Sequence, residues 1–325
     1  NACRFSPDNK FLATGGDDKA IRVWNIAAGT SSIIVDSSNA VTSVAYVASA
    51  NKVASGRRDG IVTVREATTG NITRIFSSID SSQSPTDGRW TYIAGSSIDA
   101  VAFNSGATRL AIARADYSVI VIDPATGSVI KKFDVGSQVS SIRYSPDGTK
   151  LLTGHRDNAV KTWNSTSGAP DKTFSAHTAA VTSVLWSSDG TKSISGSDDR
   201  TIKIWDVTTA NVIRTFEGHS GSVIALALSS DGKYLASADA DTIRVWGYPA
   251  GTHYSTATGH GAAITALAFS ADNSWVLSTA RDGAVKVWRP LSGYNSYTYG
   301  EYEGEGLTIA LDGDHFMTGT SDGQT

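Results

Sequence analysis

Six histidines, one cysteine and a series of recurring aspartates are the residues of this sequence that are best suited to acid–base or metal chemistry. The histidines are His155, His177, His219, His253, His260 and His315. No two of them have the spacing H-x-x-x-H, and Cys3 alone cannot form a C-x-x-C pair. The patterns of a dinucleotide-binding loop and of a Walker phosphate loop are also absent. The sequence therefore predicts no enzyme, no cofactor and no bound metal.

The aspartates recur at a regular interval, which indicates internal repeats rather than one site. A marker aspartate stands in a turn of each repeat, and in several repeats a tryptophan follows about six residues later. The markers are Asp18, Asp59, Asp116, Asp157, Asp199, Asp282 and Asp322, with Asp239 or Asp241 in repeat six. The tryptophans Trp163, Trp205, Trp246 and Trp288 are 42, 41 and 42 residues apart. We therefore expect the aspartates to serve the structure of the repeat first.

Residues 178–207 show what one repeat contains. Three β-type runs, AVTSVLW, KSIS and TIKIWD, are separated by the turn sequences SSDG and GSDDR. Repeats two and three depart from this pattern, because Arg65 and Ile122 stand where the tryptophan is expected and Ile112 replaces the Ser/Thr. We interpret these departures as structural drift, and the alternative is that a weakened repeat faces a partner.

The motifs resemble those of the WD-repeat (WD40) β-propeller family over nearly the whole chain. The resemblance is carried by IKIWD at the end of repeat five and by the pairs Gly218-His219 and Gly259-His260, with Ala176-His177 as a variant. It implies an all-β propeller whose blades are four-stranded antiparallel sheets. It also implies a hydrogen-bonded chain of histidine, Ser/Thr, aspartate and tryptophan inside a blade, because each buried polar group needs a partner.

Three repeats offer this chain. The residues are His177, Ser195, Asp199 and Trp205 in repeat five, His219, Ser237 and Trp246 in repeat six, and His260, Ser278, Asp282 and Trp288 in repeat seven. Repeat six has a shorter turn, so its acid stays open between Asp239 and Asp241.

Eight repeats can be counted, and the last, 306–325, is incomplete. We expect a single propeller domain over 1–325 with eight blades, and seven blades plus an extra hairpin is the alternative. The chain starts without methionine and within a β-type run, so we expect a fragment of a longer protein. The net charge of −3 gives no global attraction to nucleic acid, and no apolar run is long enough to span a membrane. We expect an intracellular location, in the cytoplasm or the nucleus.

One insertion interrupts the period, because Asp59 and Asp116 are 57 residues apart rather than about 41. The extra residues fall within 77–97, whose Ser, Asp, Pro and Gly content is typical of a loop. Arg89, Trp90 and Tyr92 near its end are residue types that often anchor interfaces. The alternative is that Trp90 and Tyr92 cap the edge of blade three.

Basic residues gather just before the marker aspartates of repeats two, three and four. They are Arg57, Arg58, Arg114, His155 and Arg156, and Arg281 holds the equivalent place in repeat seven. If these side chains are exposed on one rim, they form a basic arc that could bind an acidic or phosphorylated segment. The alternative is a solvated rim without a ligand.

These observations favour a non-catalytic protein–protein interaction scaffold in a larger complex, with partners bound by the rim turns and the insertion of one face. The alternative is an RNA- or ribonucleoprotein-associated propeller that uses the basic arc. The net acidity of the chain makes nucleic acid the weaker hypothesis.

Overall fold

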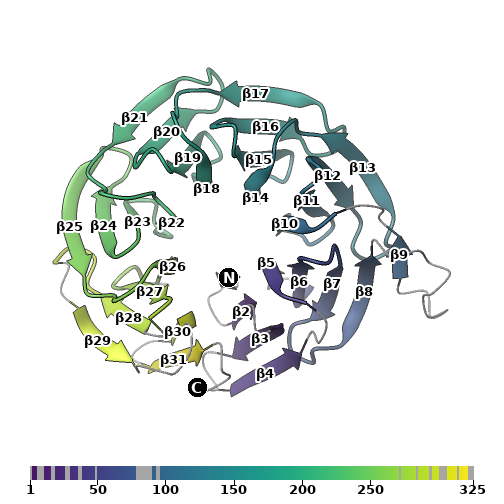
Figure 1. Ribbon diagram of the computed structural model, residues 1–325, viewed down its shortest axis with the longest axis horizontal. Coiled ribbons are helices and arrows are strands. Elements are labelled where there is room, and N and C mark those ends of the chain that lie inside the picture. The colour runs from purple at the N-terminus through teal and green to yellow at the C-terminus, as the bar shows by residue number, and fades with distance from the viewer. Residues whose placement is uncertain are drawn as a thin grey trace. The chain divides into compact units, whose positions relative to one another are not determined.

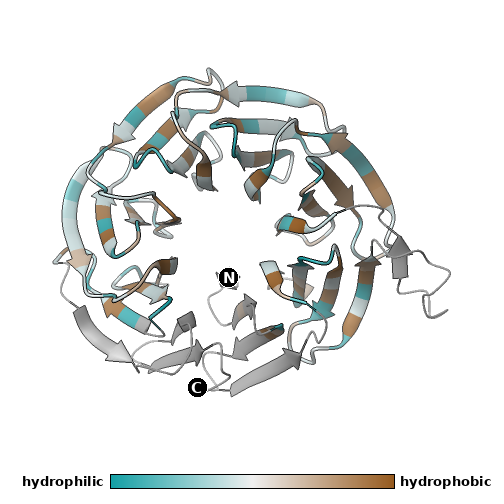
Figure 2. Ribbon diagram, in the orientation of Figure 1, coloured by the Kyte–Doolittle hydropathy of each residue, from teal (hydrophilic) through white to brown (hydrophobic). Residues whose placement is uncertain are grey.

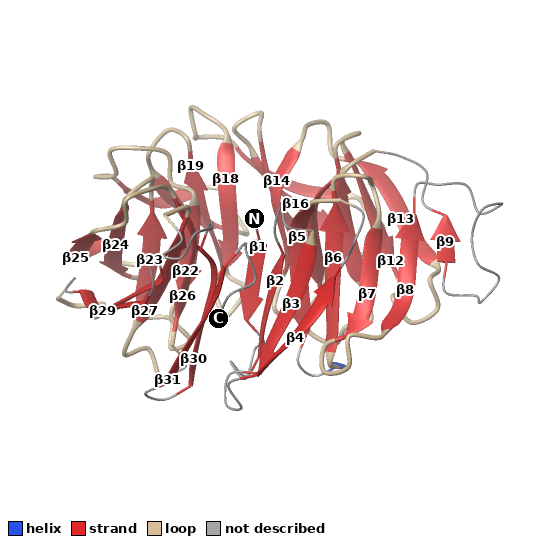
Figure 3. Cartoon of the chain, turned by 60° about the horizontal axis from the view of Figure 1, so that its bottom comes forward, coloured by secondary structure: helices blue, strands red, loops and turns tan. Residues whose placement is uncertain are grey.

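The structure is a computed structural model of the chain. It describes residues 2–5, 11–15, 19–25, 30–35, 39–47, 50–77, 90–92, 96–270, 272–282, 285–292, 295–299, 306–312 and 315–320. Strands and loops make up almost all of the described chain (Figure 3). None of its helices is long and apolar enough to cross a membrane, within these ranges.

The described strands form eight sheets, which matches the number of repeats in the sequence. Six sheets have four strands, one has five and one has two, and in each the strands follow one another in chain order (Figure 1). The chain is therefore all-β and built from four-stranded antiparallel blades. Closure with eight or with seven blades stays a prediction.

Contacts between Cα atoms divide the chain into two compact units, 1–151 with 163–171, and 152–162 with 172–325. A single domain over 1–325 stays a prediction.

The first unit holds three whole sheets. They are β1 (Ala2–Phe5), β2 (Phe11–Gly15), β3 (Ala20–Asn25) and β4 (Thr30–Val35); β5 (Val41–Val47), β6 (Lys52–Arg57), β7 (Val62–Glu66), β8 (Ile72–Ser77) and β9 (Trp90–Tyr92); and β10 (Ile98–Phe103), β11 (Leu110–Arg114), β12 (Ser118–Ile122) and β13 (Val129–Asp134).

The sheet of repeat four contributes residues to both units, and its strands are β14 (Val139–Tyr144), β15 (Lys150–His155), β16 (Val160–Asn164) and β17 (Pro170–Phe174). The second unit holds the remaining sheets. They are β18 (Val181–Trp186), β19 (Lys192–Ser197), β20 (Ile202–Asp206) and β21 (Val212–Phe216); β22 (Ala225–Leu228), β23 (Tyr234–Ala238), β24 (Thr242–Gly247) and β25 (Thr252–Thr258); β26 (Ile264–Phe269), β27 (Val276–Ala280), β28 (Val285–Trp288) and β29 (Asn295–Tyr299); and β30 (Gly306–Asp312) and β31 (His315–Thr320).

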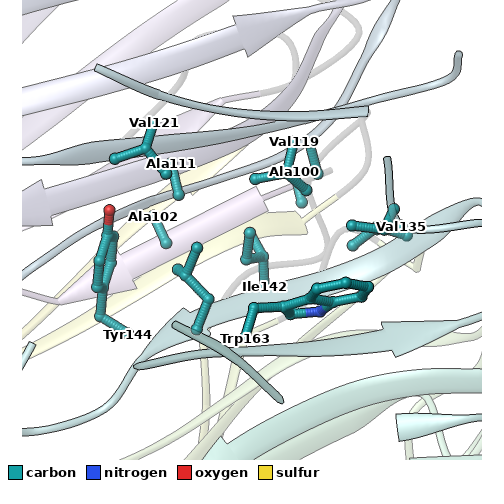
Figure 4. Close-up of a cluster of buried hydrophobic side chains, with 12 residues drawn as sticks. Ala100, Ala102, Ala111, Val119, Val121, Val135, Ile142, Tyr144 and Trp163 are labelled. Carbon is teal, nitrogen blue, oxygen red and sulfur yellow. The ribbon is translucent and has the colours of Figure 1, made fainter. Parts of the chain in front are cut away.

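The sheets bury their faces against one another within each unit. In the first unit the sheet of repeat three packs on residues of repeat four, and Figure 4 shows Val135, Ile142 and Trp163 in this cluster. In the second unit, Val181, Val184 and Trp205 form part of a comparable cluster. The middle strands are mostly buried, whereas β13 and β21 carry both hydrophobic and hydrophilic bands (Figure 2). The fourth strands β13 and β21 are thus exposed edges of their blades.

The insertion adds a strand to the sheet of repeat two. Its segment β9 pairs with β8 in parallel, with Trp90 opposite Ile75 and Tyr92 opposite Ser77. All other described ladders are antiparallel. Part of the segment that composition predicts to be a loop is therefore a β-strand, because its β-prone residues (Trp, Thr and Tyr) reach an open sheet edge.

Candidate functional site

A continuous hydrogen-bonded chain crosses the blade of repeat five. The Trp205 Nε1–H donates to Ser195 Oγ at 2.8 Å, and Ser195 Oγ lies 2.7 Å from His177 Nε2. On its other side, His177 Nδ1 lies 2.7 Å from Asp199 Oδ2. Strands β19 and β20 hold the serine and the tryptophan, while the segments before β18 and after β19 bring the histidine to the aspartate.

The donor groups of this hydrogen-bonded chain determine which nitrogen of His177 carries the proton. Since the Trp205 N–H can only donate, the Ser195 hydroxyl is free to donate to His177 Nε2, so Nδ1 carries the imidazole proton and donates to Asp199. Burial lowers the pKa of His177 and outweighs the opposing effect of Asp199, so the imidazole is neutral at pH 7. Burial opposes ionisation of Asp199, but hydrogen bonds from Thr201 and His177 prevail and lower its pKa to about 2.

Repeat seven has the same chain, with His260 Nε2 2.7 Å from Ser278 Oγ and Nδ1 2.9 Å from Asp282 Oδ2. The Trp288 Nε1–H donates to Ser278 at 2.8 Å.

In repeat six the acid is Asp239 rather than Asp241. Its Oδ2 lies 3.1 Å from His219 Nδ1, although the two atoms are not aligned for a hydrogen bond. The rest of the hydrogen-bonded chain in this blade is complete, since Ser237 Oγ lies 2.7 Å from His219 Nε2 and accepts the Trp246 N–H at 2.8 Å. Asp239 is buried and the pKa of its carboxyl is about 2, since contacts with His219 outweigh the opposing effect of burial.

Repeats two and three replace the histidine with an arginine from their own second strand. Arg57 is 4% exposed and pairs with Asp59 through two contacts, Nε–Oδ1 at 3.0 Å and Nη2–Oδ2 at 2.8 Å. Arg114 is 1% exposed, and its Nη2 lies 3.1 Å from Asp116 Oδ2. Both guanidinium groups therefore neutralise the turn aspartate from inside the blade.

Repeat four uses a histidine in the same place. His155 is fully buried at the end of β15, and its Nε2 lies 2.7 Å from Thr153 Oγ1. The residue four before the first strand, where repeats five and seven have their histidine, is Val135 here, and it packs in the apolar cluster with Trp163.

The predicted basic arc is therefore only partly exposed. The expectation that Arg57, Arg114 and His155 project from the rim is wrong, because each ends a second strand that is buried along almost its whole length. Arg58, Arg156 and Arg281 stand in the turns and are exposed.

Arg89 and most of the 77–97 insertion lie outside the described residues, as does Asp322 at the end of repeat eight. Trp90 and Tyr92 lie in β9, where the structure describes the strand and its pairing. Within the described ranges, no three His, Cys, Asp or Glu side chains are grouped so that they could hold a metal ion.

The model of the family "WD domain, G-beta repeat" matches residues 1–25, 127–164, 168–206, 210–247 and 251–289, which is more than half of the chain. The chain belongs to the WD40 family. Its fold is accordingly a β-propeller, and the WD40 resemblance inferred from the sequence is confirmed. Proteins of this family generally act as protein-interaction scaffolds and are typically non-catalytic.

Two curated relatives and one solved structure show how far the similarity extends. Periodic tryptophan protein 2 of Arabidopsis thaliana is 40% identical over 63 residues, which cover 19% of this WD40 chain and 7% of that protein. Angio-associated migratory cell protein of Homo sapiens is 22% identical over 182 residues, 55% of this chain and 42% of that protein. The crystal structure of the computationally designed Ika8 protein superposes with a TM-score of 0.78 and 28% identity, over 99% of this chain and 93% of that one. The chain thus matches less than half the length of these two curated relatives.

Proposed function

We propose that this WD40 chain is a non-catalytic protein–protein interaction scaffold in a larger complex. The observation that carries the proposal is the use of its buried polar side chains. The histidines, serines and aspartates that could have done chemistry are bonded to one another inside the blades. The groups left for recognition are those of the exposed turns and of the insertion.

The turn arginines Arg58, Arg156 and Arg281 suit an acidic or phosphorylated segment of a partner. A guanidinium can bind a carboxylate or phosphate through two hydrogen bonds, which fixes orientation as well as charge. These arginines are exposed, so their free energy of pairing is small until a partner excludes water. Tyr117 lies in the equivalent turn of repeat three and is 49% exposed, which adds an aromatic contact of the kind found at interfaces.

The test is affinity capture from native lysate with the wild-type chain and the variant R58E/R156E/R281E, followed by mass spectrometry. We expect the variant to lose specific partners while its melting temperature stays the same, because the three side chains are exposed. If the variant captures the same set of partners as the wild type, the three turn arginines do not bind partners. If the material lost is RNA, with binding that falls steeply as salt rises, the ribonucleoprotein alternative is favoured instead.

A further inference from the structure

The fourth strand of repeat three has an open edge that differs from its counterparts. In the described part of the chain, β13 is the last strand of its sheet and no strand pairs with its second edge. Val129 is 49% exposed and Ile130 is 37% exposed, and the exposed Lys131 and Lys132 follow them directly. Each face of this unpaired strand therefore carries one apolar side chain and one cation.

The backbone of this strand is oriented to accept another strand. The Val135 N–H donates to the Tyr117 carbonyl, and the β12–β13 register places Phe133 opposite Val119. Because the hydrogen-bonding direction alternates along an antiparallel strand, Phe133 faces β12 and the N–H and C=O of Lys132 face the open edge.

The chain itself shows that this kind of edge takes an extra strand. In repeat two the equivalent strand β8 pairs with β9 in parallel, and Phe76 of β8 occupies the place that Phe133 has in β13. The geometry of a fourth strand in this protein is therefore compatible with a fifth strand beside it.

The lysines determine which strand would be accepted. Lysine on an edge strand discourages pairing with an uncharged strand or with a second copy, because the ammonium group would be desolvated without a partner. No ion pair involves Lys131 or Lys132 in the described residues. A strand that carries carboxylates converts the same lysines into attractive contacts.

The other fourth strands with described side chains lack this combination. β17 starts with Pro170, and the Asp171 carboxylate is paired with Lys150 at 2.6 Å. β21 exposes Val212 and Ile213 but has one cation, Arg214, and β25 has no Lys or Arg.

We propose that the open edge of β13 binds an extended, acidic segment of a partner protein, rich in β-branched residues, as an added fifth strand. The partner's main chain would pair with β13, and its carboxylates would face Lys131 and Lys132. This surface does not include Arg58, Arg156 or Arg281, so the proposal can fail without affecting the function proposed above, and the reverse also holds.

The probe is a fluorescent peptide of about ten residues in which pairs of valines alternate with pairs of glutamates, so that each face of the strand carries carboxylates. Its binding is measured by fluorescence anisotropy with the full chain. We expect saturable binding, together with slower hydrogen exchange of the Lys132 amide. Two further peptides carry N-methyl groups on alternate backbone nitrogens, in one phase or the other. Strand addition requires that only one phase abolishes binding, because only one set of N–H groups faces β13. Equal binding of both peptides overturns the proposal.

Charge reversal in K131E/K132E should weaken binding of the valine–glutamate peptide by at least roughly tenfold. It should also create binding of a valine–lysine peptide. The matched control is K172E on β17, which should leave both affinities unchanged. Absence of peptide binding, or loss of binding in the control alone, contradicts the proposal. Binding of oligouridine that depends on Lys131 and Lys132, without peptide binding, also contradicts it and assigns the lysines to nucleic acid.

Discussion

At the scale of single residues, the blades provide a partner for the turn aspartate in two ways. A turn aspartate accepts from a histidine that precedes the first strand in repeats five and seven, and from Arg57 of the second strand in repeat two. In repeat three, Arg114 of the second strand forms an ion pair with the turn aspartate. The sequence contains a signal for this exchange. In repeats two to seven, the residue two positions before the aspartate is small where the histidine is present, as at Ser197 and Ala280, and long where the histidine is missing, as at Arg57. The prediction of an exposed basic residue at this position was wrong because the second strand is buried up to its last residue.

Replacement of the central serine tests the hydrogen-bonded chain. In Ser195→Ala, the Trp205 N–H and His177 Nε2 lose their common partner inside the blade, at a cost of about 1–3 kcal/mol for each group. Urea unfolding should show a lower midpoint with an unchanged slope.

The control for this variant is Ser193→Ala on the same strand. Its Oγ is also buried but has no hydrogen-bond partner among the described residues, so its removal should change the free energy of unfolding little. Equal effects of the two substitutions would show that the chain of contacts through Ser195 adds nothing to stability.

The adjacent arginines of repeat two give a second prediction. Arg57→Glu places a buried carboxylate against Asp59 and should destabilise the fold by about 3–5 kcal/mol. Arg58→Glu changes an exposed turn residue and should stay within about 0.5 kcal/mol of wild type. Thermal unfolding of the two variants distinguishes them, and an unaffected Arg57→Glu would contradict the assignment of Arg57 to the blade interior.

At the scale of elements, the turn between the third and fourth strands of one repeat packs on the fourth strand of the repeat before it. A Cβ atom added at Gly168 would lie 2.6 Å from the Phe133 ring, and one added at Gly251 would lie 2.7 Å from Phe216. Arg74 donates to the Ala125 carbonyl at the corresponding place, from both Nε and Nη2. These contacts join residues of different repeats. The turn sequences therefore predict the turns themselves, but not that the turns pack on Phe133 and Phe216 of the preceding repeat.

Two glycines with almost the same φ angle allow the cost of the left-handed backbone to be separated from the cost of side-chain crowding. Gly148 has φ +71°, and a Cβ atom added there would meet Asn104 only at an ordinary contact distance of 3.7 Å, whereas Gly168 has φ +70° and meets Phe133. Gly148→Ala should cost about 1–2 kcal/mol for the left-handed conformation alone. Gly168→Ala should cost about 1–3 kcal/mol more, because the phenylalanine must shift. Chemical denaturation measures both, and equal losses would contradict the packing of the turn on Phe133.

At the scale of the whole molecule, the period of the sequence predicted a β-rich repeat protein, since turn and strand signals recur in nearly every repeat. The resemblance of the motifs to the WD40 family added the expectation of a propeller with four-stranded blades. The pairing of β9 with β8 could not be predicted, because it depends on an open edge that is distant in sequence rather than on local propensity. The acid of repeat six was likewise open until the shortened turn placed Asp239, rather than Asp241, beside His219.

The stability of the whole chain should depend on pH through its buried histidines. Burial lowers the pKa of His177, His219 and His260, with the aspartate contacts only partly opposing it. An unfolded histidine titrates near pH 6.5, so below that pH the unfolded chain binds protons that the folded chain does not. Stability is therefore fully present above about pH 6.5, and it falls as the pH decreases.

The decrease can reach about 1.4 kcal/mol per pH unit for each histidine. The carboxyls of Asp199 and Asp239, with pKa values of about 2, add a further loss only below about pH 4. Urea midpoints measured from pH 8 to pH 5 should stay level and then decline, and His260→Gln should make the decline shallower because one of the three groups no longer titrates. A stability that rises towards pH 5, or a slope that His260→Gln leaves unchanged, would mean that these imidazoles are not held neutral inside the blades.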